Sequence, residues 1–537
     1  MSSTTQHKTP GVYVTEVDGF PASVVGVETS LPAFVGYTEQ AHVQGKPVFF
    51  KPQKISSFAD FVQVFGQGFK PAVQITTVDA ATVQKSPDAY DVSFVDADGA
   101  TIYLAIGKSG GVHFNLYASM KLFFENGGSD CYVVSVGDYT DQGAKPDGVA
   151  VDASKLKEGL AELADIVGPT MLVVPDAVLL TPDDPDKAWS CDAFYEVVNA
   201  MKAQCGQLQD RFAILDVYGA ETLDQADPET FQKDLEANVA EFRTKIGSED
   251  LSYAAAYFPF LKTTTYPVSD ITYTWFDQAE LAAVLTQQAE ALYKEEQLVE
   301  VKAMIDRTAS GEGPTKPDEI VALNDNLLNA LPVLSEIEKQ TALLLGVLPP
   351  SAGMAGVYTQ VDNTRGVWSA PANVALASVL APTVHINDKM QEDLNMPLDG
   401  KALDAIREFP GRGTVVWGAR TLLGNSQDWR YIQVRRTIIY IEQSIKLALQ
   451  QFCFSPNNSK TWSTVVSSVS NFLHQVWAQG GLLGATASEA YSVDCGLGST
   501  MTEQDILDGT MIVQVRLQMI HPGEFIELTL KQQMDEA

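Results

Sequence analysis

The chain has 537 residues, of which 36 are Lys or Arg and 68 are Asp or Glu, so its formal net charge is −32. A charge of that sign and size repels nucleic acids and anionic membranes, and neither is expected as a partner. The hydrophobic content of 45% and the mean hydropathy of −0.02 are those of a folded protein with about two to four domains.

The sequence shows no targeting or membrane signal. No apolar run reaches the roughly 18 residues that a membrane span requires. Met1 to Lys8 is polar and contains no apolar signal region. We therefore expect the protein to be made in a cytoplasm.

Cysteine and histidine are too dispersed to suggest a metal site. The cysteines include no C-x-x-C pair and the histidines no H-E-x-x-H spacing, so we expect reduced thiols, no metal and no cofactor. The five cysteines are Cys131, Cys191, Cys205, Cys453 and Cys495.

The negative charge is unevenly distributed. Residues 401–537 contain 11 basic and 13 acidic side chains, whereas the first 400 residues contain 25 basic and 55 acidic ones. Two interpretations fit this asymmetry: a solvated acidic surface that aids solubility, or a C-terminal part that faces a different neighbour.

The first predicted strand runs from Pro10 to Val17, where β-branched and aromatic residues alternate. Gly19, Pro21 and Gly26 follow closely and leave the strand without a local partner. Because an isolated strand is unstable in water, it must pair with a distant segment or with another molecule. The candidate pairing residues of this arm are Val12, Tyr13, Val14 and Val17.

A buried strand (31–37) and a short helix (58–66) precede a predicted β-hairpin whose turn is Asp96-Ala97-Asp98-Gly99. Directly after it, residues 107–111 match the G-x-S-x-G pattern of a nucleophile elbow, with Ser109 as the candidate nucleophile. No downstream histidine has a supporting motif, so a flexible connector is the preferred interpretation.

Helices and apolar strands alternate from about residue 114 to residue 258, which predicts a parallel sheet covered on both faces. Asp176 and Asp216 lie at strand ends, where α/β enzymes place catalytic groups. Helix capping and turn formation explain these aspartates equally well. Residues 277–345 then form a charged, helix-forming insertion split near Gly311.

A helix predicted from Thr461 to Gln479 has an apolar face and an opposite face with no charge. Solvated helix faces are usually charged, so a neutral polar face favours contact with another protein, although an ordinary half-exposed helix remains an alternative. The residues of the neutral face are Ser463, Thr464, Ser467, Ser468, Ser470, Asn471 and Gln475.

Two further strands are predicted at the C-terminus, from Gly509 to Gln518 and from Glu524 to Lys531, separated by His521-Pro522-Gly523. The second strand must fold back as a hairpin or add to a neighbour's sheet, because an unpaired apolar strand promotes aggregation. Its candidate pairing residues are Phe525, Ile526, Leu528 and Leu530.

Several stretches resemble contractile tail sheath proteins almost residue for residue. They include the opening motif Pro10-Gly11-Val12-Tyr13, the segment FFENGGSDCYVVSV that ends at Val136, Asp362 to Asn373, and Phe409 to Leu422, a short strand bracketed by Arg412 and Arg420. The resemblance covers most of the chain and is weakest in the inserted regions.

This resemblance implies an α/β fold (α+β overall) with a subtilisin-like core that contains a parallel sheet. The expected organisation is an N-terminal arm (1–20), a core (21–400) with insertions at about 71–111 and 277–345, a C-terminal α+β domain that faces an inner tube (401–521), and a C-terminal strand arm (522–537). The resemblance also implies that both arms pair with strands of neighbouring C-terminal domains.

The implied function is that of a structural subunit, not an enzyme: a sheath that polymerises helically around a tube and contracts from a metastable extended state. Expected partners are other sheath subunits (identical, with paralogues as an open alternative), the tube protein, and baseplate and terminal cap proteins. Assembly is expected in a bacterial cytoplasm. The particle is a phage tail or, as the long helical insertion favours, a released extracellular injection particle.

Two more specific hypotheses concern sites. The neutral helix face is expected to touch the tube through Lys460, Ser463, Ser467 and Asn471. The alternative function is a soluble α/β hydrolase that uses Ser109 or the strand-end aspartates.

Overall fold

The computed structural model describes residues 24–86, 89–108, 112–140, 149–184, 187–223, 225, 228–309 and 313–525. These residues form two compact units. The larger one, here called the body, comprises residues 28–440 and 521–525, and the C-terminal unit comprises residues 24–27 and 441–520. The division falls inside helix α13 (Ile432–Leu449), whereas the sequence expectation placed a boundary near residue 401.

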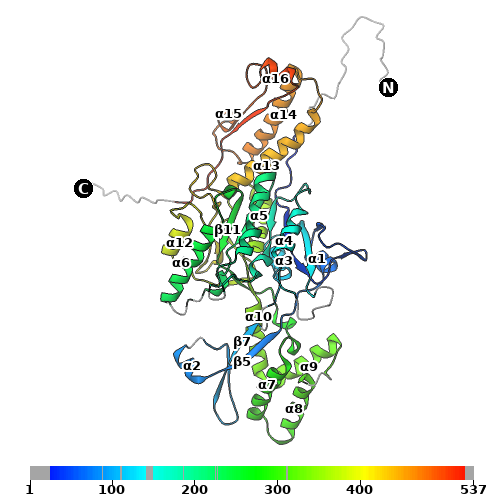
Figure 1. Cartoon of the computed structure of the whole chain (residues 1–537), viewed down its shortest axis with the longest axis vertical. Coiled ribbons are helices and arrows are strands. Elements are labelled where there is room, and N and C mark those ends of the chain that lie inside the picture. Colours follow the sequence, from blue (N-terminus) through cyan, green and yellow to red (C-terminus); the bar gives the residue numbers. More distant parts are fainter. Residues whose placement is uncertain are drawn as a thin grey trace, which may run out of the picture. The chain divides into compact units, whose positions relative to one another are not determined.

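A nine-stranded mixed sheet runs through the body, with the strand order β14-β17-β16-β11-β10-β9-β1-β8-β4. Figure 1 labels β11, one of its strands, among the surrounding helices. The six strands from β16 to β8 are parallel, and β4, β17 and β14 are antiparallel additions at the two edges. The prediction of a mixed α/β fold with a large parallel sheet is therefore confirmed. The strands are β1 (Pro32–Thr38), β4 (Gln53–Ile55), β8 (Cys131–Asp138), β9 (Met171–Val173), β10 (Phe212–Asp216), β11 (Ala254–Phe258), β14 (Val374–Ala375), β16 (Asp404–Phe409) and β17 (Gly413–Val416).

Both faces of this sheet are buried, because side chains of successive residues enter two different hydrophobic cores. In β1, Val35 and Tyr37 enter one core and Phe34 enters the other. Such continuous apolar strands are typical of parallel sheets covered on both sides, and each large buried side chain contributes about 1.5–3 kcal/mol. The helices that contribute to the first core are α4 (Ala153–Ala161), α5 (Asp192–Leu208) and α6 (Pro228–Lys245); those of the second are α1 (Phe58–Phe65), α3 (Leu116–Glu125) and α11 (Ser351–Arg365).

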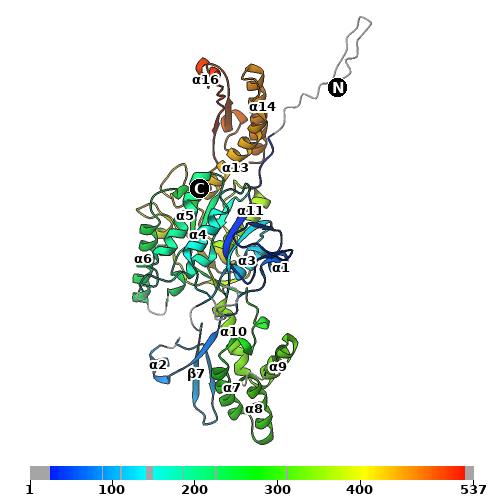
Figure 2. The same ribbon diagram turned by 45° about the vertical axis from the view of Figure 1, so that its right-hand side comes forward.

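The two insertions predicted from the sequence join into one inserted unit with its own core. Alternating residues of the three-stranded sheet β5-β7-β6 pack against helices that follow more than 160 residues later, such as Leu104 against the cluster that contains Leu285 and Ile337. Figure 2 shows strand β7 beside α7. The elements are β5 (Val73–Val78), α2 (Ala80–Lys85), β6 (Val92–Val95), β7 (Thr101–Lys108), α7 (Gln278–Leu292), α8 (Glu295–Ala309), α9 (Pro317–Ala330) and α10 (Pro332–Leu345).

The helix-forming insertion has a break that the sequence analysis did not predict, besides the one near Gly311. Helix α7 ends at Leu292 and α8 begins at Glu295, whose φ is +51°. An Asp277 side chain caps α7 by accepting the N–H groups of two following residues. The apolar periodicity continues through the break, so the pattern alone gave no sign of the turn.

The remaining elements of the body are short. They are β2 (His42–Val43), β3 (Lys46–Pro47), β12 (Leu261–Thr263), β13 (Val347–Leu348), β15 (Val379–Pro382), α12 (Asp388–Asn395) and the 3-10 helices Pro175–Leu179, Ala220–Thr222, Leu251–Tyr253, Val268–Asp270 and Tyr273–Trp275.

The C-terminal unit contains the end of α13, a long helix α14 (Ser459–Ala478) and a two-stranded ribbon of β18 (Tyr491–Asp494) and β19 (Gln514–Leu517). The side chain of Asn458 caps α14 by accepting two backbone N–H groups. Its other elements are the 3-10 helix Gln450–Phe452, α15 (Ala487–Ala490) and α16 (Glu503–Leu507).

The strand predicted from Gly509 to Gln518 is shorter in the structure, since β19 begins at Gln514. Of the strand predicted from Glu524 to Lys531, only the first two residues are described, and they are not in a strand. Across the described residues, every helix is too short or too polar to cross a membrane.

Candidate assembly surfaces

Asp176, one of the two strand-end aspartates, is fully buried and supports a loop junction. Its carboxylate accepts backbone N–H groups from Tyr37 at 2.7 Å, Asn115 at 2.6 Å and Leu116 at 3.1 Å. Burial raises its pKa to about 6, although these three hydrogen bonds act in the opposite direction. Both oxygens are therefore committed to holding the end of β1 against the start of α3.

Asp216, the other strand-end aspartate, fixes the start of α11. It accepts the backbone N–H of Ser351 at 2.8 Å and the hydroxyl of the same residue at 2.6 Å. Burial raises its pKa to about 7, against these two hydrogen bonds. Ser109 lies outside the described residues, and the hydrolase alternative has no support. The described residues also contain no group of three or more His, Cys, Asp or Glu side chains arranged to hold a metal ion.

The ribbon of β18 and β19 is the first candidate assembly surface. Its four residue pairs run from Tyr491 opposite Leu517 to Asp494 opposite Gln514, and among the described residues neither strand has a second strand partner. Helix α14 packs against β18. A two-stranded ribbon is marginal alone, and its outer edges present unpaired backbone groups, so it can accept strands from other chains.

The exposed stripe of α14 is the second candidate surface. Lys460, Ser463, Ser467 and Asn471 are all exposed and follow one another at helical spacing. Ser468 was expected on this face but is buried, at 2% exposure. The neutral face is therefore narrower than the sequence predicted.

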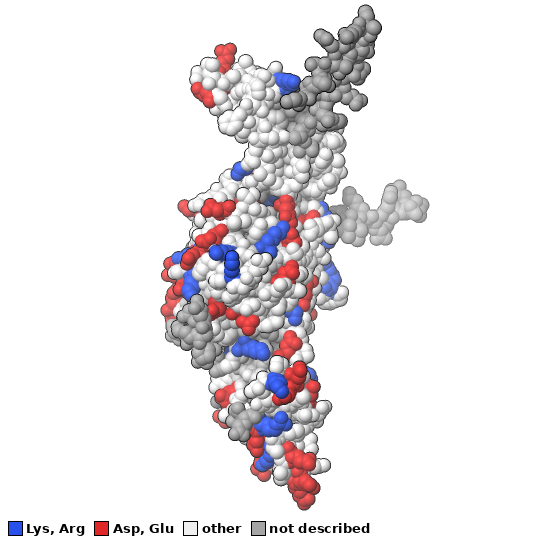
Figure 3. All heavy atoms as spheres, turned by 90° about the vertical axis from the view of Figure 1, so that its right-hand side faces the viewer, with Lys and Arg blue, Asp and Glu red and all other residues white. Residues whose placement is uncertain are grey.

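The sequence around this stripe is poor in charge. No Asp or Glu occurs from residue 443 to residue 488, and Lys446 and Lys460 are the only Lys or Arg residues there. On the face shown in Figure 3, few of the described side chains of the C-terminal unit are red or blue, whereas the body carries many acidic and basic side chains. A partner can cover this part of the C-terminal unit without burying an unpaired carboxylate.

The third candidate surface is the socket that holds Glu524, where the chain leaves the body. Arg420 donates from Nε to Oε1 at 2.9 Å and from Nη2 to Oε2 at 2.7 Å. Asn395 donates to Oε1 at 2.7 Å, and the hydroxyl of Tyr431 donates to Oε2 at 2.9 Å. Burial alone would raise the pKa of Glu524, but hydrogen bonds from Arg420 and Asn395 hold it below its ordinary value.

Asp404, a second carboxyl group, lies beside this socket. It accepts the backbone N–H of Arg420 through Oδ1 at 2.8 Å, and its Oδ2 is buried with no hydrogen-bond partner among the described residues. Burial raises the pKa of Asp404 well above its ordinary value, and the charge of Glu524 adds to that effect. Arg420 therefore lies between two carboxyl groups whose pKa values are shifted in opposite directions, downward for Glu524 and upward for Asp404.

The structure places the predicted site residues as follows. Phe525 is 70% exposed and directly follows the anchored Glu524. The other predicted arm residues, Val12, Tyr13, Val14, Val17, Ile526, Leu528 and Leu530, lie outside the described residues.

Sequence reasoning missed the Glu524 socket. The available signal was the expectation that the arginines at both ends of the 409–422 stretch need partners, because arginine is rarely buried unpaired. Nothing in the sequence pattern showed that the partner of Arg420 lies 104 residues downstream.

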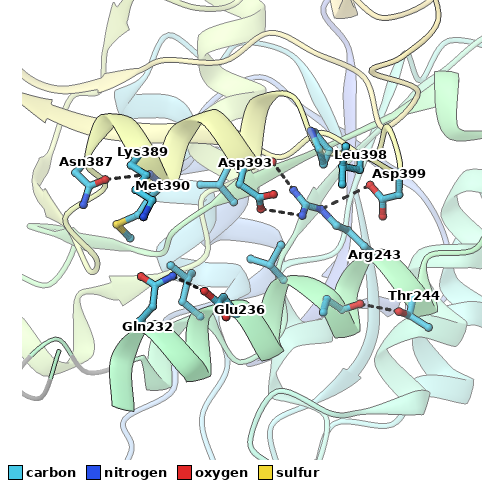
Figure 4. Close-up of a pocket in the computed structure, with 15 residues that line it drawn as sticks. Gln232, Glu236, Arg243, Thr244, Asn387, Lys389, Met390, Asp393, Leu398 and Asp399 are labelled. Carbon is cyan, nitrogen blue, oxygen red and sulfur yellow. Dashed lines mark hydrogen bonds and ion pairs between the residues drawn. The ribbon is translucent and has the colours of Figure 1, made fainter. Parts of the chain in front are cut away.

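The groove between α6 and α12 is not one of the candidate assembly surfaces. In Figure 4, Arg243 reaches across it from α6 toward Asp393 and Asp399, and Gln232 points to Glu236. Arg243 pairs with Asp393 at 2.9 Å, and Gln232 donates to Glu236 at 2.7 Å. The contacts of Arg243 join α6 to α12 and to the loop that follows α12, so the two sides of the groove are packed against each other.

Comparisons with known proteins find relatives among tail sheath proteins. The sequence profile of a family described as the phage tail sheath C-terminal domain matches residues 425–533. The tail sheath protein of Burkholderia phage BcepMu is 30% identical over 144 residues, which are 26% of this chain and 30% of that protein. The chain therefore matches that relative over less than a third of its length.

Two solved structures match nearly the whole chain. The sheath complex of an extracellular contractile injection system, PVC, in its contracted state is 25% identical with a TM-score of 0.56, over 99% of each chain. The contracted helical sheath of the anti-feeding prophage (AFP) is also 25% identical with a TM-score of 0.56, over 98% of this chain and 100% of that one.

Proposed function

This chain belongs to the contractile tail sheath family, and from that premise we propose that it is a structural subunit of a contractile sheath. The subunits polymerise helically around an inner tube. The single observation that carries the proposal is the β18–β19 ribbon, whose two outer edges pair with no other strand among the described residues. The sequence is strand-forming near both ends of the chain. Strand addition satisfies these edges.

The subunits are joined by their arms. Residues 1–20 and 526–537 of one subunit add strands to the ribbons of neighbouring subunits, whereas Glu524 stays bound to its own subunit. Such contacts are heterologous, since the arm and the ribbon are different surfaces, and heterologous contacts that do not close produce a helical polymer. The ion pair between Arg420 and Glu524 supports this proposal because it gives the C-terminal arm a fixed starting point.

Contraction is a transition between two packings of the same subunits. The extended sheath is metastable, and its conversion to the contracted packing drives the tube through a target envelope. No cofactor is required, because the free energy is stored in the extended assembly. The arms keep neighbouring subunits connected while their bodies move.

The exposed stripe of α14 faces the inner tube. Lys460, Ser463, Ser467 and Asn471 make neutral or weakly ionic contacts, each worth about 0–1 kcal/mol, which suits a surface that must detach during contraction. The absence of Asp and Glu between residues 443 and 488 supports this assignment.

The family relationship supports several further parts of the proposal. The parallel sheet follows a subtilisin-like layout, and the sheath ends on a baseplate and a terminal cap. Assembly takes place in a bacterial cytoplasm. The match covers nearly all of the PVC and AFP chains but only 30% of the phage protein, which favours a released injection particle over a phage tail.

Two truncations test the proposal. Deleting residues 526–537 removes the arm but keeps Glu524, and deleting residues 522–537 removes both. Each variant should stay soluble and form no long sheaths in electron micrographs, whereas the full chain forms tubes. Normal sheaths from either variant would refute the role of the C-terminal arm.

A further inference from the structure

The hairpin of β16 and β17 holds an arginine in an unusual setting. Gly411 and Gly413, with φ of +75° and +70°, make the tight turn around Arg412. The Arg412 guanidinium is exposed and lies 5.8 Å from the ring centre of Phe409 and 5.7 Å from that of Trp417. It also donates to the side-chain oxygen of Asn373. These contacts fix the guanidinium before any partner binds.

Arg412 differs from the neighbouring arginines in lacking a carboxylate. Arg407 pairs with Asp388 at 2.9 Å, and Arg420 pairs with Glu524. Across the described residues, no Asp or Glu lies within ion-pair distance of Arg412. In a chain with a net charge of −32, an oriented and unpaired arginine is a site for an acidic group.

Arg412 contacts two residues that line a cavity of about 790 Å³, although it does not line the cavity itself. Three carboxylates also line the cavity: Asp388 and Glu524, which pair with Arg407 and Arg420, and Glu392. Trp417 and Asn373 line it, as do two apolar side chains that are largely exposed, Met396 at 57% and Phe525 at 70%. Arginine and tryptophan are enriched among the residues that dominate protein–protein binding energy. The arginine–tryptophan surface, defined as Arg412, Trp417, Met396 and Phe525 around this cavity, therefore fits a protein segment that offers carboxylates next to apolar side chains.

The turn between α7 and α8 offers that combination. In this acidic turn, defined as residues 292–300, Leu292 is 53% exposed and Val299 is 68% exposed. The side chains of Glu295, Glu296 and Glu300 are also exposed, and within the described residues none of them pairs with Lys or Arg.

The charge of the surrounding insertion strengthens the match. Residues 277–345 contain 13 acidic and 5 basic side chains. The insertion therefore approaches a basic group of another subunit with a favourable long-range field. The positive φ of Glu295 fixes the turn in a defined shape.

We propose that the arginine–tryptophan surface of one subunit binds the acidic turn of a second copy of this chain. Arg412 pairs with a carboxylate of the turn, and Val299 or Leu292 enters the cavity. The two surfaces differ, so the contact is heterologous and adds to a helical polymer without closing it. This inference rests on the proposed polymerisation and adds a contact between bodies to the contacts made by the arms.

Charge reversal tests the contact. In tube-free assembly, Arg412→Glu should raise the protein concentration at which sheath polymer forms by about tenfold, because a like charge replaces the attraction. Arg365→Glu is the matched control, since it reverses the charge of an exposed arginine at the end of α11. It should leave the concentration at which polymer forms unchanged. Adding Glu296→Arg and Glu300→Arg to the Arg412→Glu chain should restore assembly, because every subunit then carries both reversed surfaces.

Sedimentation and electron microscopy measure how much sheath polymer forms, and thermal unfolding checks that each variant folds. Unchanged assembly by Arg412→Glu would overturn the inference. So would a defect that the added arginines do not relieve, or a defect that appears only when the inner tube is present. If the unaltered chain forms no polymer at all, the proposed function fails instead.

Discussion

Arg420 and Glu524 form a two-point ion pair across 104 positions of the chain, and the arginine side chain is only 3% exposed. This pair is the last described fixed point before the C-terminal arm. A bidentate pair that is partly buried contributes more than a surface ion pair, and loss of one member leaves the other charge uncompensated.

Glu524→Gln should therefore destabilise the body by about 1–3 kcal/mol in denaturant unfolding. Hydrogen exchange at residues 521–525 should accelerate at the same time. Glu408→Gln, at an exposed glutamate of β16 without a described ion pair, is the matched control and should change neither quantity. An unchanged exchange rate in Glu524→Gln would show that the socket does not hold the arm.

Asp404→Asn should alter the pH dependence of stability. Because folding raises the pKa of Asp404, the folded state binds the proton more tightly, and this stabilisation is lost as pH rises from about 4 toward the folded pKa. Asn mimics the protonated carboxyl and does not titrate. Near pH 4.5 the variant and the unaltered protein should have the same free energy of unfolding. Above that pH, the free energy of unfolding of the variant should exceed that of the unaltered protein by up to about 1.4 kcal/mol for each pH unit.

Unfolding measured at pH 4.5 and pH 8 checks this expectation. Glu408→Gln again serves as the control that removes an exposed carboxyl group. A constant difference between Asp404→Asn and the unaltered protein at both pH values would show that Asp404 is already ionised in the folded state.

Asp216→Ala should lower the free energy of unfolding by about 2–4 kcal/mol, because it leaves the backbone N–H and the hydroxyl of Ser351 buried without their acceptor. Asp216→Asn keeps one acceptor oxygen and should cost less. Urea unfolding separates the two variants. If Asp216→Ala were as stable as the unaltered chain, its contact with Ser351 would not be structural.

Ser467→Glu and Asn471→Glu should each weaken assembly on the inner tube while leaving the fold intact, since both side chains are exposed on α14. A carboxylate covered by a partner without a counter-ion costs several kcal/mol. Co-assembly with purified tube protein, followed by pelleting, measures the effect. Gln504→Glu adds the same charge at an exposed position of α16 and should assemble normally. Normal assembly of both α14 variants would place the tube contact elsewhere.

The acidic insertion should lie on the outside of the sheath. Ten of the thirteen acidic side chains between residues 277 and 345 lie outside the acidic turn, and they are best solvated away from the packed centre of the assembly. Cryo-electron microscopy of assembled sheaths checks the location directly. An insertion that lines the lumen would contradict this expectation.

The central sheet was predictable because each of its strands can be recognised from its own local sequence. The strands that became β1, β8, β9 and β10 are short apolar runs between helices, and such runs indicate a parallel sheet whatever lies elsewhere in the chain. The neutral stripe of α14 was predictable for the same reason, since a helix face is a local pattern. Ser468 shows the limit, because a polar residue near the edge of a face is buried or exposed according to what packs there.

The contacts between distant segments were not predictable. Asp216 looked equally like a catalytic group and a helix cap until the position of Ser351, 135 residues away, was known. Arg412 and Arg420 bracket the same short strand, yet one is exposed on aromatic rings and the other is buried against Glu524. Hydrophobic periodicity predicts the secondary structure of a segment, but it does not predict which distant segment packs against it.

The shared core of the inserted unit makes its two segments a single exchangeable cassette. Removing either segment alone would leave half of an apolar core facing water, for example Ile75 and Leu104 without Leu285. The nine strands of the central sheet include none from either segment, so the central sheet is complete without them. A designer who wishes to shorten this subunit, or to display a foreign domain on the particle, should cut at both places at once.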